Sequence, residues 1–321
     1  MCTAISLTAN DHYFGRNLDL NYSFQESVVV MPRKFPLKFR CTKATDSHFA
    51  MIGVATVDNG YPLFYDAVNE YGLSIAGLNF PDNAAYLPKD ISSVNITPFE
   101  FIPWILCQCK TVAEAETLLK KVRIVDIPYN DRYSLTPLHW IIADKDRSIT
   151  VEPMASQVMI YENPFGILTN NPQFPYHLDN LRHYTHLSPQ NPVPSSWNNL
   201  RPVSNGTGAL GLPGDFSSVS RFIRAAFIKE TAAFNDDDRE NIMQFFHMLQ
   251  SVQQVYGSVR NGDQYHKTVY SSCCNATQGI YYYTTYYNSQ VTGINMHHND
   301  LECKEITIHP LNTQPVIKMD N

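Results

Sequence analysis

The sequence predicts a layered α+β fold built on antiparallel sheets. Stretches typical of strands and of helices come in blocks along the chain, and not in the strict βαβα alternation of a Rossmann-type fold. Neither a Gly-x-Gly-x-x-Gly loop nor a Walker-type loop is present, so nothing indicates nucleotide chemistry. With 321 residues and a hydrophobic fraction of 44%, the chain can bury a large core.

The N-terminal block contains four stretches in which apolar and polar residues alternate, as they do in strands. Turn residues separate these stretches, among them the Asp-Asn-Gly of residues 58–60 and Gly72. The predicted strands are residues 3–7, 27–31, 51–57 and 73–78.

Two helices are expected next. Pro98 suits the start of a helix that extends to about residue 109, and Pro103 is expected to kink this helix. Thr111 and Glu114 form a capping box for a second helix, because their side chains can satisfy free backbone N–H groups of the first turn.

The second half repeats this order of strands followed by helices. Residues 188–213 are rich in Pro, Ser, Asn and Gly, and they predict a long surface excursion rather than a linker. The acidic run at residues 236–238 suits the N-terminus of a helix. The predicted strands are 138–142, 148–152, 157–161 and 167–169, and the predicted helices are 219–234 and 238–255.

The chain ends in another block of strands, at residues 268–272, 279–287, 290–295 and 306–309. The tyrosine-rich run 281–287 alternates too little for a strand with one solvent face, so we expect cover on both faces.

Composition excludes several classes of protein. The net charge of −6 does not support nucleic-acid binding, and no apolar run approaches the roughly 18 residues of a membrane helix. The N-terminus lacks a basic region followed by an apolar one, so we expect a cytoplasmic protein without a signal peptide. Seven cysteines, an odd number, argue against a disulfide framework. No histidine pair at zinc-like spacing accompanies Cys107 and Cys109, so we expect no metal.

Cys2 becomes the first residue of the chain if Met1 is removed. One residue then carries both a thiol, whose thiolate is the reactive form, and an α-amine, whose reference pKa of roughly 7.7–8 suits a base near neutral pH. A nucleophile and a base on one residue are the working parts of an N-terminal nucleophile hydrolase.

The residues around Cys2 resemble the start of the choloylglycine hydrolase family, which contains bile salt hydrolases and penicillin V acylases. The similarity extends over nearly the whole chain in family order. It comprises Met-Cys-Thr-Ala-Ile-Ser at 1–6, Tyr-Phe-Gly-Arg-Asn-Leu-Asp at 13–19, Ala-Gly-Leu-Asn-Phe-Pro at 76–81, Leu-Thr-Asn-Asn-Pro at 168–172 and Gly-Leu-Pro-Gly-Asp-Phe-Ser-Ser-Val-Ser-Arg at 211–221.

The resemblance implies an αββα sandwich of two antiparallel sheets between helix layers, formed by residues 1–321 as a single domain from which Met1 is removed. It implies Cys2 as the nucleophile and its α-amine as the proton shuttle. Arg16 would lie beside the thiol, where its charge favours the thiolate. Asp19 would accept a hydrogen bond from the amine. From the residues alone, the favoured interpretation of Arg16 and Asp19 is an ordinary surface ion pair.

The resemblance also implies that Asn79 and Asn170 donate to the oxyanion, one from the backbone and one from the side chain, and that Arg221 completes the polar surroundings. Asn171 is the competing candidate for Asn170, and both asparagines otherwise fit turns. We expect Arg224 to be solvated. No organic cofactor is implied, and the family is commonly tetrameric, so a homotetramer is expected.

His139 is expected in the core or in support of the site, because no histidine has the sequence context of a papain-type Cys-His enzyme. Substrate contacts are expected from apolar residues near the motifs, each of which is also consistent with a core position. These candidates are Leu18, Leu20, Tyr22, Phe24, Tyr61, Phe64, Tyr65, Leu135 and Leu138.

Asn79 favours one substrate class within the resemblance. Family members that act on bile salts tend to carry asparagine there, whereas many penicillin V acylases carry tyrosine. We therefore expect hydrolysis of glycine- and taurine-conjugated bile salts, with penicillin V as the alternative. A non-catalytic protein that binds amphipathic acids is the alternative from another class, and it would have no need of Cys2.

Overall fold

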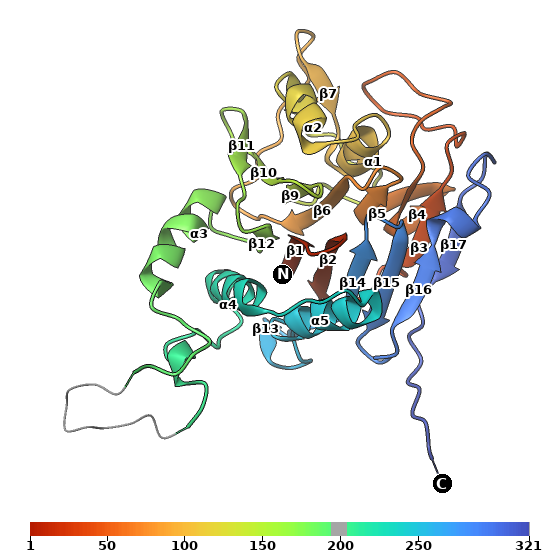
Figure 1. Cartoon of the computed structure of the whole chain (residues 1–321). Coiled ribbons are helices and arrows are strands. Elements are labelled where there is room, and N and C mark those ends of the chain that lie inside the picture. Colours follow the sequence, from red (N-terminus) through yellow and green to blue (C-terminus); the bar gives the residue numbers. More distant parts are fainter. Residues whose placement is uncertain (194–203, 321) are drawn as a thin grey trace.

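The computed structural model describes residues 1–193 and 204–320. Two antiparallel sheets stack face to face, and helices cover both outer faces (Figure 1). This arrangement is the four-layer αββα sandwich expected from the family resemblance.

The first sheet contains the N-terminal strand β1, which lies between β12 and β2. Its strands follow the order β12-β1-β2-β14-β15-β16, and β13 adds to β14. All its pairs are antiparallel, and β1 and β2 form a hairpin in which Cys2 lies opposite Leu18. The strands are β1 Cys2–Thr8, β2 His12–Leu20, β12 Ile167–Leu168, β13 Val259–Asn261, β14 Gln264–Asn275, β15 Ile280–Thr285 and β16 Thr292–Asn295.

The second sheet has eight strands in the order β11-β10-β9-β6-β5-β4-β3-β17, again all antiparallel. A separate parallel pair joins β7 Val94–Ile96 to β8 Val122–Ile124. The eight strands are β3 Ser27–Met31, β4 Met51–Asp58, β5 Tyr61–Asn69, β6 Ser74–Asn79, β9 Leu138–Ala143, β10 Ser148–Pro153, β11 Val158–Glu162 and β17 Thr307–Pro310.

Helices α1 Phe101–Leu106 and α2 Val112–Leu119 cover the eight-stranded sheet, while α4 Ser218–Thr231 and α5 Asp238–Gln250 cover the other sheet (Figure 1). Helix α3 Phe174–Leu181 packs beside α4. No helix among residues 1–193 and 204–320 is both long enough and apolar enough to cross a bilayer.

Apolar side chains fill the spaces on both sides of the eight-stranded sheet. Between the sheets, Ala4 of β1 and Leu78 of β6 belong to one buried cluster. Beneath α1, the rings of Phe101 and Trp140 stack at 4.1 Å. Burial of this kind stabilises the fold by about 25 cal/mol per Å² of apolar surface. The β1–β2 hairpin belongs to this buried core and is held in place by it.

We did not predict β2 and β5, although both are long. Eight of the nine residues of β2 are buried, so both of its faces are covered and the polar–apolar alternation is lost. The buried residues of β2 include the charged Arg16 and Asp19. Buried charged residues are unusual in a strand, and these two belong to the candidate site.

Several details of the structure differ from the prediction. Pro103 does not kink a long helix, because a 3₁₀ turn at Pro98–Glu100 precedes α1 and Pro103 lies in the first turn of α1. Helix α5 ends at Gln250, not at residue 255. The burial of side chains along β15 does alternate, because Tyr281 and Tyr283 are buried and the intervening Tyr282 is half-buried. Within the predicted surface excursion at 188–213, residues 194–203 lie outside the described part of the chain.

Candidate active site

Cys2 begins β1 and is buried, with 3% of its surface exposed. Its backbone N–H donates to the side-chain oxygen of Asn170 over 2.8 Å. Met1 continues the β1–β2 ladder, because its ammonium group donates to the carbonyl of Asp19 at 2.7 Å and its carbonyl accepts from Asp19 N–H at 2.9 Å. Removal of Met1 would therefore leave the α-amine of Cys2 beside the Asn170 amide oxygen.

Arg16 lies two pairs along the same hairpin, and its side chain is fully buried. Its Nη1 donates to the carbonyls of Gly77, at 2.6 Å, and Tyr65, at 3.0 Å, in the opposite sheet. Burial opposes the charged form of this guanidinium, but the anionic forms of Cys2, Tyr270 and Asp66 favour it and hold the pKa of Arg16 above its usual value. Arg16 therefore supplies positive charge beside Cys2.

Asp66 of β5 is a second charged residue at this place, and we did not predict it. It is buried and accepts hydrogen bonds from the hydroxyls of Tyr270, at 2.5 Å, and Tyr281. Burial raises the pKa of Asp66, while Arg16 and the two tyrosines oppose this shift. The aspartate and its partners link the two sheets next to Arg16.

Asp19 does not form the surface ion pair with Arg16 that was one interpretation of their spacing, because both side chains are completely buried. One oxygen of Asp19 accepts from Thr268 Oγ1 at 2.6 Å, and its other oxygen has no partner among the described residues. Burial raises the pKa of Asp19, and the ammonium of the N-terminus and Arg221 oppose this shift. The positive charge of the N-terminus therefore favours the ionised form of the Asp19 carboxyl group.

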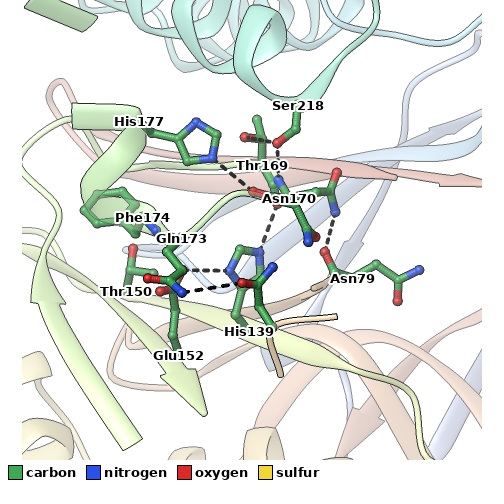
Figure 2. Close-up of polar contacts among 12 residues, drawn as sticks. Asn79, His139, Thr150, Glu152, Thr169, Asn170, Gln173, Phe174, His177 and Ser218 are labelled. Carbon is green, nitrogen blue, oxygen red and sulfur yellow. Dashed lines mark hydrogen bonds and ion pairs between the residues drawn. The ribbon is translucent and has the colours of Figure 1, made fainter. Parts of the chain in front are cut away.

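Asn170 connects the site residues. Its side-chain oxygen accepts from Cys2 N–H and from Arg221 Nη2 at 2.7 Å. Its Nδ2 donates to the carbonyl of Asn79 at 2.7 Å, a contact shown in Figure 2. Asn171, the competing candidate, instead donates to the carbonyl of Pro81 at 2.5 Å. The structure thus brings Asn170, and not Asn171, against Cys2.

Arg221 of α4 is completely buried and approaches Cys2 from the helix layer. Its Nη1 donates to the Cys2 carbonyl and to Thr3 Oγ1, at 2.7 Å from the latter. Arg224, which we expected to be solvated, is also buried and donates to the carbonyls of Pro213 and Ser251. Arg224 therefore connects the segment before α4 to the C-terminal end of α5. No hydrogen bond links it to Cys2 in the described part of the chain.

Asn79 lies at the end of β6, and its backbone faces the site. Phe80 N–H donates to the Pro137 carbonyl, so the preceding pair, Asn79 with Leu138, is a non-hydrogen-bonded pair of the ladder. The N–H and C=O of Asn79 consequently point away from β9, toward the side where Asn170 Nδ2 meets the carbonyl. Asn79 N–H and Asn170 Nδ2 are therefore two donors at the same edge of β6, and Asn79 lines a cavity beside Cys2.

A cavity of about 260 Å³ opens beside Cys2, Arg16 and Asn79. Its remaining walls are mostly apolar and aromatic. Eight of the nine candidate substrate contacts line it, namely Leu18, Leu20, Tyr22, Phe24, Phe64, Tyr65, Leu135 and Leu138.

Tyr61 is the exception and does not line the cavity. It stacks at 5.9 Å on Tyr129, which does line it, so Tyr61 supports the wall from behind. Further lining residues were not predicted. Most of them come from the segments before α1 and before β9, which carry no periodic signal, whereas Leu63, Ile102 and Trp140 lie within β5, α1 and β9. The further lining residues are Leu63, Pro98, Phe99, Ile102, Pro128, Tyr129, Tyr133, Ser134, Thr136 and Trp140.

Side chains that could bind a metal do not cluster in the described part of the chain. No group of three or more His, Cys, Asp or Glu side chains there could hold a metal ion. Cys107 and Cys109 are buried free thiols, and burial raises the pKa of each to about 12. Cys273 and Cys274 are completely buried in the core.

Comparison with known proteins identifies relatives over the whole chain. Residues 2–309 match the family model of linear amide C–N hydrolases, choloylglycine hydrolase family. The chain is 46% identical to a bile salt hydrolase/transferase of Lactiplantibacillus plantarum, over 98% of each protein.

Solved structures agree with this match. The crystal structure of the C2A mutant of the conjugated bile acid hydrolase of Clostridium perfringens is similar, with a TM-score of 0.93, 38% identity and 100% of both chains covered. Penicillin V acylase of Agrobacterium tumefaciens shares the fold, with a TM-score of 0.76, 20% identity and coverage of 96% of this chain and 90% of that one. These likenesses confirm the N-terminal nucleophile hydrolase fold, and the chain belongs to the choloylglycine hydrolase family of linear amide C–N hydrolases.

Proposed function

We propose that this enzyme hydrolyses the amide bond of glycine- and taurine-conjugated bile salts through an acyl-enzyme on Cys2. The observation that carries the proposal is the position of Cys2 and Arg16 beside a largely apolar cavity with aromatic walls. Such a cavity fits a steroid, and the polar residues lie at one place where the amide would reach them. The proteins compared above that act on conjugated bile acids support the same substrate class.

The first step is attack by the Cys2 thiolate on the amide carbonyl. Negative charge then develops on the carbonyl oxygen, where Asn79 N–H and the second hydrogen of Asn170 Nδ2 donate to it. Donors held in place before the reaction lower the barrier because they need no reorganisation when the charge appears. Arg16 stabilises the thiolate before the attack.

The α-amine of Cys2 carries the protons in both halves of the reaction. Its ammonium form gives a proton to the leaving glycine or taurine nitrogen as the C–N bond breaks and the thioester remains. The amine then accepts a proton from water, whose oxygen attacks the thioester and releases the bile acid and the thiol. We propose that Asp19 and Asn170 hold the amine in position. Residues 2–321 would act as a single domain.

Replacing Asn170 by alanine is expected to lower kcat strongly while the protein still folds. The variant loses an oxyanion donor and the acceptor beside Cys2 N, and loss of one such donor typically costs about 10²–10³ in kcat. Asn79→Ala is the matched control, because it keeps the backbone N–H and should cost less. Steady-state kinetics with glycocholate compares the two, and equal losses would contradict the assignment of a backbone donor to Asn79.

Replacing Phe24 by alanine is expected to weaken substrate binding more than chemistry. The Phe24 ring contacts the rings of Tyr22, Tyr65 and Tyr133 on the cavity wall. Loss of the apolar contact of a half-buried ring should raise KM about tenfold. Because the ring is remote from the reacting atoms, kcat should change little. A variant with unchanged KM and reduced kcat would contradict the role of Phe24 in binding the steroid.

The substrate class is tested by measuring amine release from glycocholate, taurocholate and penicillin V. We expect rapid release of glycine or taurine. Release from penicillin V alone would instead make the protein a penicillin V acylase, which is the alternative within the family. Release from none of the three substrates would reject the proposal that the cavity binds conjugated bile salts for hydrolysis.

We also propose a cytoplasmic homotetramer. All seven cysteines are free thiols, which suits a reducing compartment. Tyr256 and Tyr287 lie exposed beside Lys267, and the exposed Tyr265 packs against Tyr256. Tyrosine-rich surfaces are common in interfaces. Size-exclusion chromatography with light scattering should give four times the 36.5 kDa chain mass, and a monomer would contradict the proposal.

A further inference from the structure

The backbone that carries Asn170 is held by two buried histidines. His177 Nε2 lies 3.0 Å from the Asn170 carbonyl, and His139 Nε2 lies 3.1 Å from the Thr169 carbonyl (Figure 2). Asn170 N–H donates to Ser218 Oγ at 2.7 Å. The segment between β12 and α3 is therefore fixed on several sides, and it reaches Cys2 through the Asn170 side chain.

The two histidines differ in what faces their second nitrogen. His177 Nδ1 has no partner among the described residues, and burial lowers the pKa of His177 to about 4. His177 is therefore a neutral ring that donates from Nε2. His139 Nδ1, in contrast, lies 3.2 Å from Oε1 of Glu152, and both side chains are completely buried.

Both nitrogens of His139 thus face oxygen acceptors, the Thr169 carbonyl and the Glu152 carboxyl group. Two close contacts of this kind are favourable only if Nε2 carries one proton and a second proton lies between Nδ1 and Oε1. The same Oε1 also accepts from Phe174 N–H, the first residue of α3, at 2.9 Å. Phe80 stacks on the imidazole at 4.3 Å, with 5° between the rings, and fixes its plane.

We propose that His139 and Glu152 form a positioning pair that sets the place of Asn170, and with it the Cys2 amine, by sharing a buried proton. The pair fixes both ends of the segment, at the Thr169 carbonyl and at Phe174 N–H. Neither residue touches the substrate. This inference deepens the proposed function and depends on it, because Asn170 is the residue through which the pair acts on the reaction.

The chemistry of the pair makes Glu152→Gln a sharp test. If the amide oxygen of the new glutamine takes the place of Oε1, it accepts from Phe174 N–H and from Nδ1–H of His139. A neutral imidazole with its proton on Nδ1 then has no proton on Nε2 to donate to the Thr169 carbonyl. If the amide nitrogen takes that place, it donates to Nδ1 but opposes Phe174 N–H. A neutral side chain of the same shape must therefore lose at least one of the three hydrogen bonds.

We expect Glu152→Gln and His139→Gln to lower kcat about 10- to 100-fold. Loss of the groups that orient the histidine ligands of a metal has an effect of this size. KM should stay close to the wild-type value, because the cavity walls are unchanged. His48→Gln is the matched control. Its imidazole is also buried between two carbonyls, those of Phe35 and Phe49, but its bonds do not lead to the active site. A wild-type kcat in both pair variants would overturn the proposal.

A double-variant cycle tests whether the pair acts through Asn170. In an Asn170→Ala background, His139→Gln should have little further effect on kcat, because the group that it positions is gone. If the losses of the two single variants multiply in the double variant, His139 does not act through Asn170 and the proposal fails.

Hydrogen exchange tests the positioning without any substrate. Glu152→Gln should raise deuterium uptake in residues 167–175, while His48→Gln should leave uptake there unchanged. Unchanged uptake in Glu152→Gln would overturn the pairing. Lack of wild-type turnover with conjugated bile salts would instead reject the proposed function and leave the exchange result intact, so the two failures can be told apart.

Discussion

The Cys2→Ala protein is expected to fold like the wild type and to release no measurable glycine or taurine. Cys2 is the thiol beside Arg16 in the cavity, and the other catalytic groups have no nucleophile to assist once it is removed. Groups that act as a unit fail together, so the loss in kcat should be on the order of 10⁶-fold. Amine release over hours measures activity, and circular dichroism and thermal unfolding measure the fold.

Cys41→Ala is the control for this experiment, because Cys41 is a half-buried free thiol and does not line the cavity. It should keep wild-type activity. Substantial residual turnover in Cys2→Ala would reject Cys2 as the nucleophile. A folded Cys2→Ala protein that binds glycocholate without cleaving it would support the cavity as the substrate site and place the chemistry on the thiol.

Retention of Met1 is expected to cause the second-largest loss of activity. With Met1 in place, the Cys2 nitrogen is an amide that donates to Asn170 and has no basic lone pair. The free amine of Met1 lies one residue away, against the carbonyl of Asp19. Loss of general acid–base catalysis alone typically costs about 10²–10⁴-fold.

One preparation can supply both states. An N-terminal extension is placed before Cys2 with a protease site whose cleavage leaves Cys2 as the first residue. We expect the uncleaved protein to be inactive and cleavage to restore turnover in step with the intact mass of the shortened chain. Activity in a protein whose mass shows the extension or Met1 still attached would contradict the role of the α-amine.

Local patterns were sufficient for most of the fold. Strand alternation located β1, β3, β4 and β6, and Thr111 does cap α2 by accepting from Glu114 N–H. The block order indicated antiparallel sheets. The β2 strand could not be found in this way because both of its faces are buried, and its polar residues resemble a loop in sequence.

The proposed catalytic residues came from the family resemblance, and the structure shows why residue patterns alone could not supply them. Cys2 and Asn170 are 168 positions apart and meet only because β1 and β12 are neighbours. His139 was expected in the core or in support of the site, and it is buried there, but Asp66 and Glu152 carried no local signal at all. Their importance depends on burial beside partners from other strands, which no sequence window contains.

The central claim is that the reaction passes through an acyl-enzyme, and trapping with hydroxylamine tests this most directly. Glycocholate and taurocholate have the same acyl group and should form the same thioester on Cys2. At a fixed hydroxylamine concentration, the ratio of cholyl hydroxamate to cholic acid should therefore be identical for the two substrates, whatever their rates. A ratio that depends on the leaving amine would mean that no common intermediate forms, and it would contradict the Cys2 mechanism.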